Sequence, residues 1–367
     1  MILNCQRDGL LSACQLVSAA VAVRTPKPIL SSIKAIAETD RLTLVATDLE
    51  VGIRYEIVGV RVEEPGEAIL PVSRVLAILR ESSDSEVSLD ADERRCRIST
   101  SISEYEMPSE DPAAFPDVPT FDDKKYHELT AGVLRTMIHR TSFAAAKQDT
   151  KYAITGILWE VEDKKVRLVA TDTRRLAMCF GPATSTTPVE NKGQSHLVPV
   201  KAMMLLERTL NDNAENVKVC LRNNDVLFQT EKATIVSRLL EGRYPPYRDI
   251  IPKKAAAKIA LPVEGFLTAV RQAKIMTDDE SKRVAFHFAP GKLTLQAQGA
   301  TTGRSKVDMP LDYNGSALTI NFDPDFIIDM LKVLDPSEVV QLDLVDAAKP
   351  ALFKVGDDYT YLVMPLT

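Results

Sequence analysis

The sequence predicts an α+β protein made of three tandem copies of one domain, each with two helices packed on antiparallel sheets. Two proline-rich stretches, at 106–127 and 241–258, divide the chain into blocks of 1–125, 126–255 and 256–367. Proline lacks a backbone donor and fixes φ, so such stretches rarely continue a helix or a central strand. Each block repeats the order helix, strands, helix, strands, and a length of 367 residues accommodates two or three domains.

The helices are predicted from apolar residues that recur every three or four positions. The segments that open the three blocks are 7–24, 131–147 and 263–274. The second helices are expected at 73–81, 201–208 and 324–334. The last of these has Asp323 as its expected N-cap and Pro324 as its first helical residue, a favourable start signal.

Strands with a tight turn follow the first helix of each block. The pentapeptide Leu-Val-Ala-Thr-Asp occurs at 44–48 and again at 168–172, each time inside an alternating apolar pattern. The segment from Leu293 is a weaker echo of it. A repeat of one pentapeptide can arise by chance, but a threefold repeat of the whole order of elements indicates duplicated domains.

The net charge of −6 by itself argues against a polyanionic partner, but the distribution of charge changes that conclusion. The six predicted helical segments carry twelve Lys or Arg and six Asp or Glu, a net charge of +6, which leaves −12 on the rest of the chain. Basic helices on one surface and acidic strands and loops elsewhere would attract a polyanion at one place only. Solvated helix surfaces are the alternative, and the count alone does not decide between the two.

No enzymatic or metal-binding motif is present. The four histidines lie outside any nucleophile or metal motif, and phosphate-binding glycine loops are missing. The five cysteines are scattered without a C-x-x-C pair, which indicates buried thiols rather than disulfides or zinc ligands. No cofactor is expected. The N-terminus lacks the pattern of a signal peptide and no membrane span is visible, so a cytoplasmic location is expected.

A few carboxylates and aromatic residues are further candidates for a functional site. Asp48 and Asp172 follow Ala-Thr at strand ends, where an Asp that bonds its own backbone in a turn is favoured over a catalytic carboxylate. Trp159, Tyr244 and Tyr247 could stack on bases, although packing in a core or anchoring of a linker is favoured. The residues do not assemble into an acid, a base and a nucleophile.

Particular strings resemble one family. LVATDTRRLA at 168–177, LLEGRYPPYRDIIP at 239–252 and YLVMPLT at 361–367 are similar to the bacterial DNA polymerase III β subunit, the DNA sliding clamp. RTPKPILSSI, which begins at Arg24, and TDLE at 47–50 resemble its first domain. The resemblance spans all three blocks in order. It implies a DNA-clamp (processivity) fold and a head-to-tail homodimer that closes into a ring around duplex DNA.

The resemblance also implies sequence-independent contacts with phosphates, weak enough to permit sliding. The matching DNA-binding positions are Arg24, Arg74, Lys147, Gln148, Lys151, Tyr152, Lys201 and Arg208. Val200 stands where the family often has a further basic residue.

A second implied site is an apolar groove between blocks two and three that takes short extended peptides from the replicative polymerase, the clamp loader and repair proteins. The matching positions are Ile154, Thr171, Thr173, Arg174, Arg175, Leu176, Pro245, Ile250, Asp323, Phe326, Ala348, Pro350, Leu362, Met364, Pro365 and Leu366. Thr173-Arg174 replaces a Gly-His of some members, Asp323 replaces an Asn, and Pro350 also departs from the pattern. The apolar C-terminus could equally be a last strand.

Ring closure would join block one of one copy to block three of the other. The resemblance implies apolar contacts of Tyr105 and Met107 with Ile275 and Met276, and pairing of edge strands across the joint. The leading hypothesis is therefore a non-catalytic clamp that tethers a polymerase to its template by effective concentration. A protein-binding scaffold of three repeated α+β domains that does not bind DNA is the runner-up, and an enzyme is third.

Overall fold

A computed structural model describes residues 1–92, 94–121, 124–148, 152–162, 164–186, 196–278 and 282–366. In these ranges the chain forms six α-helices: α1 (Arg7–Val17), α2 (Val72–Glu81), α3 (Ala131–Thr141), α4 (Val200–Thr209), α5 (Val263–Lys274) and α6 (Pro324–Lys332). Short 3₁₀ helices cover Ser18–Ala20, Pro28–Ser31, Pro112–Ala114, Ser142–Ala144 and Tyr247–Ile250. The predicted α+β class and all six predicted helices are confirmed.

The chain contacts divide it into two compact units. Unit 1 consists of Met1–Arg135, Ala183–Glu190 and Lys201–Leu239, and unit 2 of Thr136–Pro182, Asn191–Val200 and Leu240–Thr367. The division follows hydrogen-bonded sheets rather than the proline-rich stretches. The two boundaries of the three predicted blocks, at 125 and 255, remain a prediction.

Unit 1 holds two antiparallel sheets among the described residues. The first has the strand order β5 (Arg61–Glu64), β1 (Ile2–Gln6), β7 (Glu86–Ala91), β8 (Arg95–Ser99) and β9 (Glu104–Pro108). The second has the order β14 (Thr184–Ser185), β10 (His127–Thr130), β16 (Asn216–Leu221), β17 (Asp225–Gln229), β18 (Ala233–Arg238), β4 (Val51–Val58), β3 (Arg41–Thr47), β2 (Ile33–Glu38) and β6 (Gly66–Leu70). The β18–β4 pairing, with Ile235 opposite Ile53, joins strands of the first and second blocks in one sheet.

Unit 2 repeats this plan. One sheet has the order β15 (His196–Pro199), β11 (Gly156–Glu162), β12 (Lys165–Thr171), β13 (Arg175–Pro182), β26 (Tyr359–Val363), β25 (Ala351–Val355), β24 (Val339–Leu344) and β19 (Ala257–Pro262). The other has the order β22 (Gly303–Pro310), β21 (Lys292–Gly299), β20 (Val284–Ala289) and β23 (Leu318–Phe322). Here β13 pairs with β26, with Leu176 opposite Leu362, and joins the second and third blocks.

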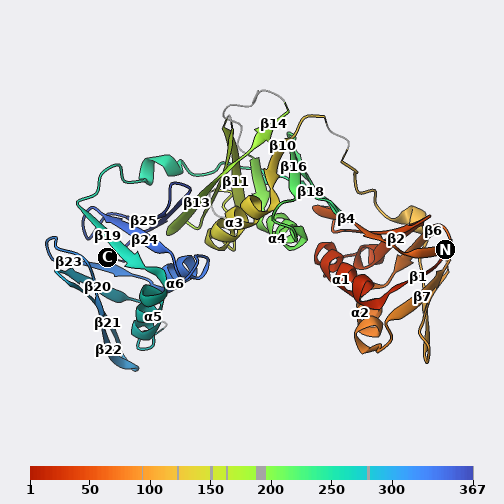
Figure 1. Cartoon of the computed structure of the whole chain (residues 1–367), viewed down its shortest axis with the longest axis horizontal. Helices are drawn as coiled ribbons and strands as arrows, with labels where there is room; N and C mark the ends of the chain where they lie inside the picture. Colours follow the sequence, from red (N-terminus) through yellow and green to blue (C-terminus); the bar gives the residue numbers. More distant parts are fainter. Residues whose placement is uncertain are drawn as a thin grey trace. The chain divides into compact units, whose positions relative to one another are not determined.

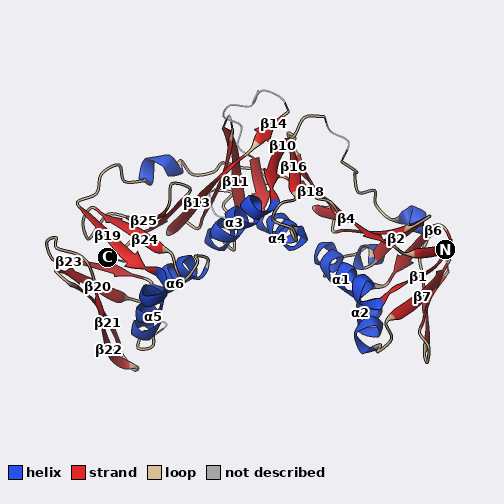
Figure 2. Cartoon of the chain, viewed as in Figure 1, coloured by secondary structure: helices blue, strands red, loops and turns tan. Residues whose placement is uncertain are grey.

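Helices pack in pairs on the strands (Figures 1 and 2). In unit 1, α1 packs against α2 and lies on β3 and β4. In unit 2, α5 packs against α6 and lies on β21 and β22. The sequence explains the orientation, because the apolar residues of each helix share one face. In α5 the buried residues are Val263, Phe266, Ala269, Val270 and Ala273, whereas Arg271 is exposed.

Two predicted helix ends are wrong. The helix expected at 7–24 stops at Val17 and continues as a 3₁₀ turn only to Ala20, because β-branched residues and two prolines follow within eight positions. The helix expected at 131–147 stops at Thr141, whose hydroxyl donates to the carbonyl of Met137 at 2.7 Å and so competes with the helical pattern. Arg24 and Lys147 therefore lie outside helices. The six observed helices carry ten Lys or Arg and six Asp or Glu, a net charge of +4 rather than +6.

The proline-rich stretches pack onto the sheets instead of spanning open space. Phe115 and Val118 are buried with Ile29, Leu30 and Val45 in a core cluster of unit 1. In the second stretch, Tyr247 is 5% exposed, and the hydroxyl of Tyr244 donates to the carbonyl of Val169 at 3.0 Å. Trp159 is fully buried, so core packing is confirmed for Trp159 and anchoring for the two tyrosines.

Candidate functional site

Two tight turns of the same construction follow the repeated Ala-Thr-Asp. The carboxylate of Asp48 accepts hydrogen bonds from the backbone of Glu50 and Val51 at 3.0 and 2.8 Å. The carboxylate of Asp172 accepts from Arg174 and Arg175, both at 3.0 Å. The residue after each Asp has a left-handed backbone, with φ of 77° at Leu49 and 78° at Thr173. The turn role predicted for both carboxylates is confirmed.

Arg175 ties the second turn to the rest of unit 2. Its guanidinium donates to Asp172 at 3.0 Å, to Asp329 of α6 at 2.7 Å and to the carbonyl of Phe143 at 2.9 Å. The group lies 4.8 Å from the ring centroid of Phe326. Burial disfavours the charged form of Arg175 and by itself would lower its pKa. The neighbouring Tyr361, Asp329 and Asp172 outweigh burial, so the pKa of Arg175 is raised. Arg175 and Phe326, both predicted site residues, are thus brought together.

An apolar cluster adjoins this turn. It consists of Ala153, Leu158, Val169, Leu176, Met178, Leu197, Tyr247, Leu352 and Leu362, with Phe180, Leu240, Tyr244 and Ile251 packed against it half-buried. We call it the Leu176 cluster. It contains the predicted site residues Leu176 and Leu362. Half-buried apolar side chains at its border mean that its surface is not fully covered by the chain itself.

The last residues of the chain lie beside the same turn. The amide of Met364 donates to the carbonyl of Arg174 at 2.8 Å, and Met364 itself is 38% exposed. The amide of Leu366 donates to the carbonyl of Asn321 at 2.9 Å, two residues before Asp323. The N-cap role predicted for Asp323 is confirmed, because its carboxylate accepts from the amide of Asp325 at 2.9 Å. Burial raises the pKa of Asp323.

The other predicted groove residues are more dispersed. Thr171 is buried and donates to the carbonyl of Arg175 at 2.6 Å, while Thr173 and Arg174 are exposed at the turn. Pro245 accepts from the amide of Tyr247 at 2.7 Å, and Ile250 is 46% exposed. Ile154 is buried and accepts from Ala146 at 3.0 Å, whereas Ala348 and Pro350 belong to the loop before β25 and Pro365 to the end of the chain.

Basic residues gather around an exposed loop of unit 1. Arg24, Lys27 and Lys201 line a concavity of about 420 Å³, together with Val23, which is 96% exposed. Lys201 also forms an ion pair with Asp48. Burial opposes ionisation of Asp48, but hydrogen bonds from Lys201, Val51 and Glu50 lower its pKa, so this carboxyl group is ionised at neutral pH. One of the predicted cations is therefore partly compensated within the chain.

The remaining predicted DNA-binding residues occupy several elements. Arg74 of α2 and Arg208 of α4 are exposed in unit 1, and Lys147 and Gln148 are exposed in unit 2 after α3. Tyr152 is half-buried. Lys151 lies outside the described residues.

The residues predicted for the joint lie near two sheet edges. Tyr105 and Met107 belong to β9, the last strand of its sheet, with exposed fractions of 41% and 5%. Ile275, which is 70% exposed, and Met276 follow α5. Met276 accepts a hydrogen bond from the hydroxyl of Thr302, in the turn before β22, at 2.9 Å. Met107 is already buried in its own unit. Among these four side chains, Tyr105 and Ile275 are therefore the exposed ones.

Sequence reasoning missed three residues of these sites. Lys27 lines the basic concavity of unit 1, and its place in RTPKP beside Arg24 could have indicated it. Asp329 and Phe143 complete the surroundings of Arg175, but they are separated from it by 154 and 32 residues. No local pattern could have found these two, because only the packing of α6 and the segment after α3 brings them to Arg175.

The described ranges contain no group of three or more His, Cys, Asp or Glu side chains able to hold a metal ion. All five cysteines are buried and none is in a disulfide bond, and burial raises the pKa of Cys14 to about 12, so it carries a neutral thiol. No helix in the same ranges is long and apolar enough to cross a membrane.

Comparison with known proteins covers the whole chain. Three family models of the DNA polymerase III beta subunit match this chain. The model of the N-terminal domain matches residues 1–119, that of the central domain 128–246 and that of the C-terminal domain 248–367. The beta sliding clamp of Pseudomonas putida is 30% identical over 369 residues, covering 98% of each chain. That of Chlamydia pneumoniae is 28% identical, covering 98% of this chain and 97% of the relative.

Solved structures agree. A sliding clamp from Pseudomonas aeruginosa bound to griselimycin has a TM-score of 0.92 at 27% identity, covering 100% of this chain and 99% of that one. A sliding clamp from Bacillus subtilis has a TM-score of 0.91 at 25% identity with the same coverage. Full-length likeness in sequence and in fold thus coincides with the repeated turns and the paired helices described above. The chain belongs to the DNA polymerase III beta subunit family, the beta sliding clamps, non-catalytic factors that confer processivity on DNA polymerase III.

Proposed function

We propose that this clamp works as a head-to-tail homodimer whose closed ring encircles duplex DNA without sequence preference. The observation that supports this most is the set of exposed cations on separate elements, Arg24, Arg74, Lys147 and Arg208. Such cations attract phosphates weakly and without register, which suits sliding. Retention on DNA would then come from topology. The proposed place of action is the cytoplasm, where a bacterial polymerase meets its template.

Retention on closed and cut DNA tests the encircling mechanism. The clamp is loaded onto nicked circular DNA by its clamp loader and then washed in about 1 M salt, at which the Debye length is only about 3 Å and weak phosphate contacts are screened. We expect the clamp to stay on the circle and to leave after one restriction cut. Equal loss from circular and linear DNA would refute encirclement.

A scaffold that does not bind DNA is the competing function, and charge reversal separates the two. Arg24→Glu, Lys147→Glu and Lys151→Glu together should weaken loading and DNA-dependent stimulation of the polymerase under the clamp proposal. The matched control is Lys258→Glu on β19 with Lys349→Glu in the loop before β25, two exposed cations outside the proposed DNA-binding set. Equal stimulation by the charge-reversed protein and wild type would favour the scaffold.

The surface bordering the Leu176 cluster is the proposed docking site for short peptides of the polymerase, the clamp loader and repair proteins. Met364, bonded to the turn beside the cluster, and Ile250, the neighbour of Ile251 in the chain, are partly exposed, and Tyr244, Leu240 and Phe180 are half-buried against the cluster. Apolar anchors of an extended peptide gain affinity by covering such side chains. The turn held by Arg175 and Asp172 gives this surface a fixed edge.

Alanine substitution tests the docking site. Met364→Ala with Leu366→Ala should weaken binding of a polymerase C-terminal peptide by about 10-fold or more, since loss of an interface anchor commonly costs more than about 1 kcal/mol. The dimer should remain intact by sedimentation. Val339→Ala on β24, a residue 56% exposed and not part of the cluster, is the control. Unchanged affinity in the double variant would reject the assignment.

A further inference from the structure

The two carboxylate oxygens of Asp48 have different partners. Oδ1 accepts hydrogen bonds from the backbone amides of Glu50 and Val51, at 3.0 and 2.8 Å. Oδ2 accepts from Nζ of Lys201, in the first turn of α4 and 153 positions away in the chain. An Asp side chain that holds such a turn needs only one oxygen for the backbone. The second oxygen is therefore available to hold a cation, and the turn itself does not require that cation.

The second Ala-Thr-Asp turn has the same construction but holds a different kind of cation. Oδ1 of Asp172 accepts from the amides of Arg174 and Arg175, and Oδ2 accepts from Nε of Arg175 at 3.0 Å. The Arg175 side chain is only 11% exposed and is also bound by Asp329. The cation of this turn is thus enclosed by its own unit and serves as a structural tie.

The cation of the first turn is open to solvent instead. The Lys201 side chain is 45% exposed and that of Asp48 is 16% exposed, so the lysine is the outer member of the pair. It lines the concavity of about 420 Å³ together with Arg24 and Lys27, and the same lining includes Asp48 and Glu50. Acidic groups within a basic surface reduce its attraction for a polyanion. This surface therefore combines cations for phosphate with carboxylates that oppose phosphate.

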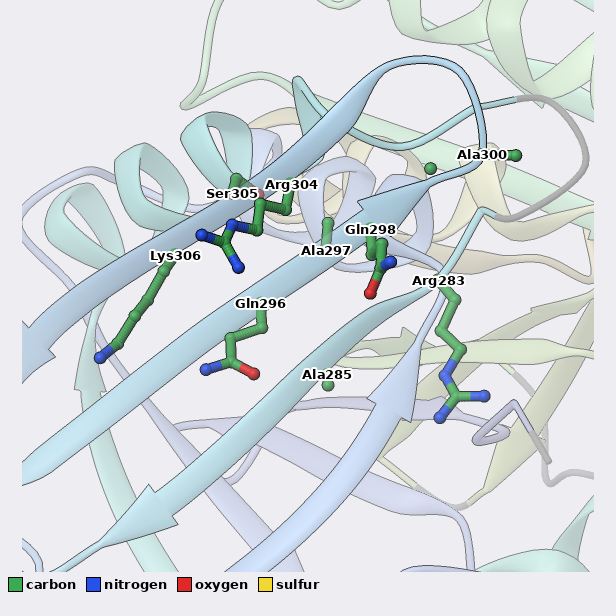
Figure 3. A pocket seen from close by; sticks show the side chains of 10 residues that line it. Arg283, Ala285, Gln296, Ala297, Gln298, Ala300, Arg304, Ser305 and Lys306 are labelled. Atoms are coloured by element: carbon green, nitrogen blue, oxygen red, sulfur yellow. The ribbon is translucent and has the colours of Figure 1, made fainter.

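Carboxylates are not a general feature of the basic concavities in the described ranges. A shallow concavity of about 990 Å³ lies over β20, β21 and β22 in unit 2, and no acidic residue is part of its described lining. Its basic residues are Arg283, which precedes β20, and Arg304 and Lys306 of β22, which stand near Gln296 of β21 (Figure 3). The carboxylate beside Lys201 is thus a particular property of the unit 1 concavity.

We propose that Asp48 competes with DNA phosphates for Lys201 and so keeps this contact of the clamp with DNA weak. A phosphate that binds Lys201 has to displace the carboxylate. The displaced carboxylate takes up a cation from solution while DNA releases one, so the net release of counterions, which drives phosphate binding, is close to zero. Asp48 thereby limits one contact without removing the cation, and weak contacts permit sliding. The inference rests on the DNA binding proposed above.

Asp48→Asn isolates this role. The amide oxygen of asparagine still accepts from Glu50 and Val51, whereas the amide nitrogen cannot accept from Lys201. Binding of the clamp to a fluorescent linear duplex is measured by anisotropy between about 0.05 and 0.2 M salt. One added phosphate contact should make the plot of log affinity against log salt steeper by about 0.9, which near 0.1 M corresponds to a gain in affinity of roughly 5–10-fold.

Asp92→Asn is the matched control in the same unit. The carboxylate of Asp92, in the turn between β7 and β8, accepts from the amides of Arg94 and Arg95 at 2.8 and 2.9 Å. Its second oxygen lies 3.4 Å from Nε of Arg95. The substitution has the same turn chemistry and the same change of charge, but Asp92 does not line the concavity. The salt dependence of DNA binding should stay that of wild type.

A second variant distinguishes competition from a purely structural role. Asp48→Asn with Lys201→Gln replaces the ion pair by a neutral pair and keeps the net charge of wild type. If Asp48 already cancels Lys201, this double variant should match wild type in affinity and in salt dependence. If Lys201 instead contacts phosphate in wild type, the plot for the double variant should be shallower by about 0.9.

The expected set of results is a steeper salt dependence for Asp48→Asn alone and wild-type behaviour for Asp92→Asn and for the double variant. A wild-type salt dependence in Asp48→Asn, an equal gain in Asp92→Asn, or a weakened double variant overturns the competition. Wild type that neither binds the duplex at low salt nor remains on circular DNA overturns the proposed DNA binding itself. Once loaded, the Asp48→Asn clamp should also diffuse more slowly along duplex DNA than wild type, and equal diffusion would contradict a role in sliding.

Discussion

At the scale of single residues, the two Ala-Thr-Asp turns show how side chains hold an unfavourable backbone. Thr173 has φ of 78°, a conformation that a β-branched residue rarely adopts. Its amide donates to the hydroxyl of Thr171 at 3.1 Å, and the carboxylate of Asp172 accepts from the next two amides. These local hydrogen bonds, together with Arg175, offset the strain.

Replacing Thr173 by glycine should stabilise the protein. The left-handed backbone costs an L-residue roughly 1–2 kcal/mol, and glycine avoids this strain. Glycine loses about 0.5–1 kcal/mol more in backbone entropy on folding, so the free energy of unfolding should rise by about 0.5 kcal/mol. Thr173→Ala, which retains a Cβ, should gain less. Urea unfolding monitored by Trp159 fluorescence measures both. Equal stabilities of the two variants would show that the backbone at this turn is not strained.

At the scale of elements, the segment after β9 behaves as part of the sheet rather than as a free linker. A Cβ added at Gly52 of β4 would lie 2.9 Å from Cγ1 of Val118 and 3.1 Å from Cγ1 of Val236. The absence of a side chain at this position thus lets Val118 approach the strand. The carbonyl of Val118 also accepts a long hydrogen bond from Arg54 at 3.5 Å.

Gly52→Val separates strand propensity from packing. Propensity favours valine in a strand, whereas the close approach of Val118 predicts overpacking and a loss of about 1–3 kcal/mol. We expect packing to prevail, which a lower urea midpoint would show. Gly9→Ala in α1 is the control, because an added Cβ there meets nothing within 4 Å and should be neutral or stabilising. A Gly52→Val protein as stable as wild type would mean that the linker is loosely held.

At the scale of the whole molecule, the sheets group the three repeats into two compact units. Each unit has its own buried clusters, and each contains one long sheet that crosses from one block to the next. Cooperative unfolding follows such bodies of mutual contact rather than the sequence repeat.

Thermal unfolding should therefore depart from two-state behaviour. The calorimetric enthalpy is expected to exceed the van't Hoff enthalpy. Gly52→Val should lower only the transition of unit 1, and Arg175→Ala, which leaves Asp329 without its arginine, only that of unit 2. Scanning calorimetry at fixed protein concentration resolves this, because association of copies also shifts the transition. A single transition moved equally by both variants would contradict two separate cooperative bodies.

The sequence by itself determined the elements and the repeat. Alternating apolar residues around Ala-Thr-Asp gave the hairpins β3–β4 and β12–β13, and Asp323-Pro324 marked the start of α6, because these signals are local. Helix ends near Val17 and Thr141 escaped prediction, because weak competing hydrogen bonds and nearby prolines decide them.

Only the tertiary structure decided which elements share a sheet and which distant residues meet. The β18–β4 and β13–β26 pairings, the contact of Arg175 with Asp329, and the ion pair of Lys201 with Asp48 depend on residues far apart in the chain. The alternation of apolar and polar residues in a sequence determines which face of a strand is buried. It does not determine which strand pairs with it, because backbone hydrogen bonds between strands are chemically alike. Packing of the apolar faces selects that partner, and it also decides which charges meet, such as those of Lys201 and Asp48.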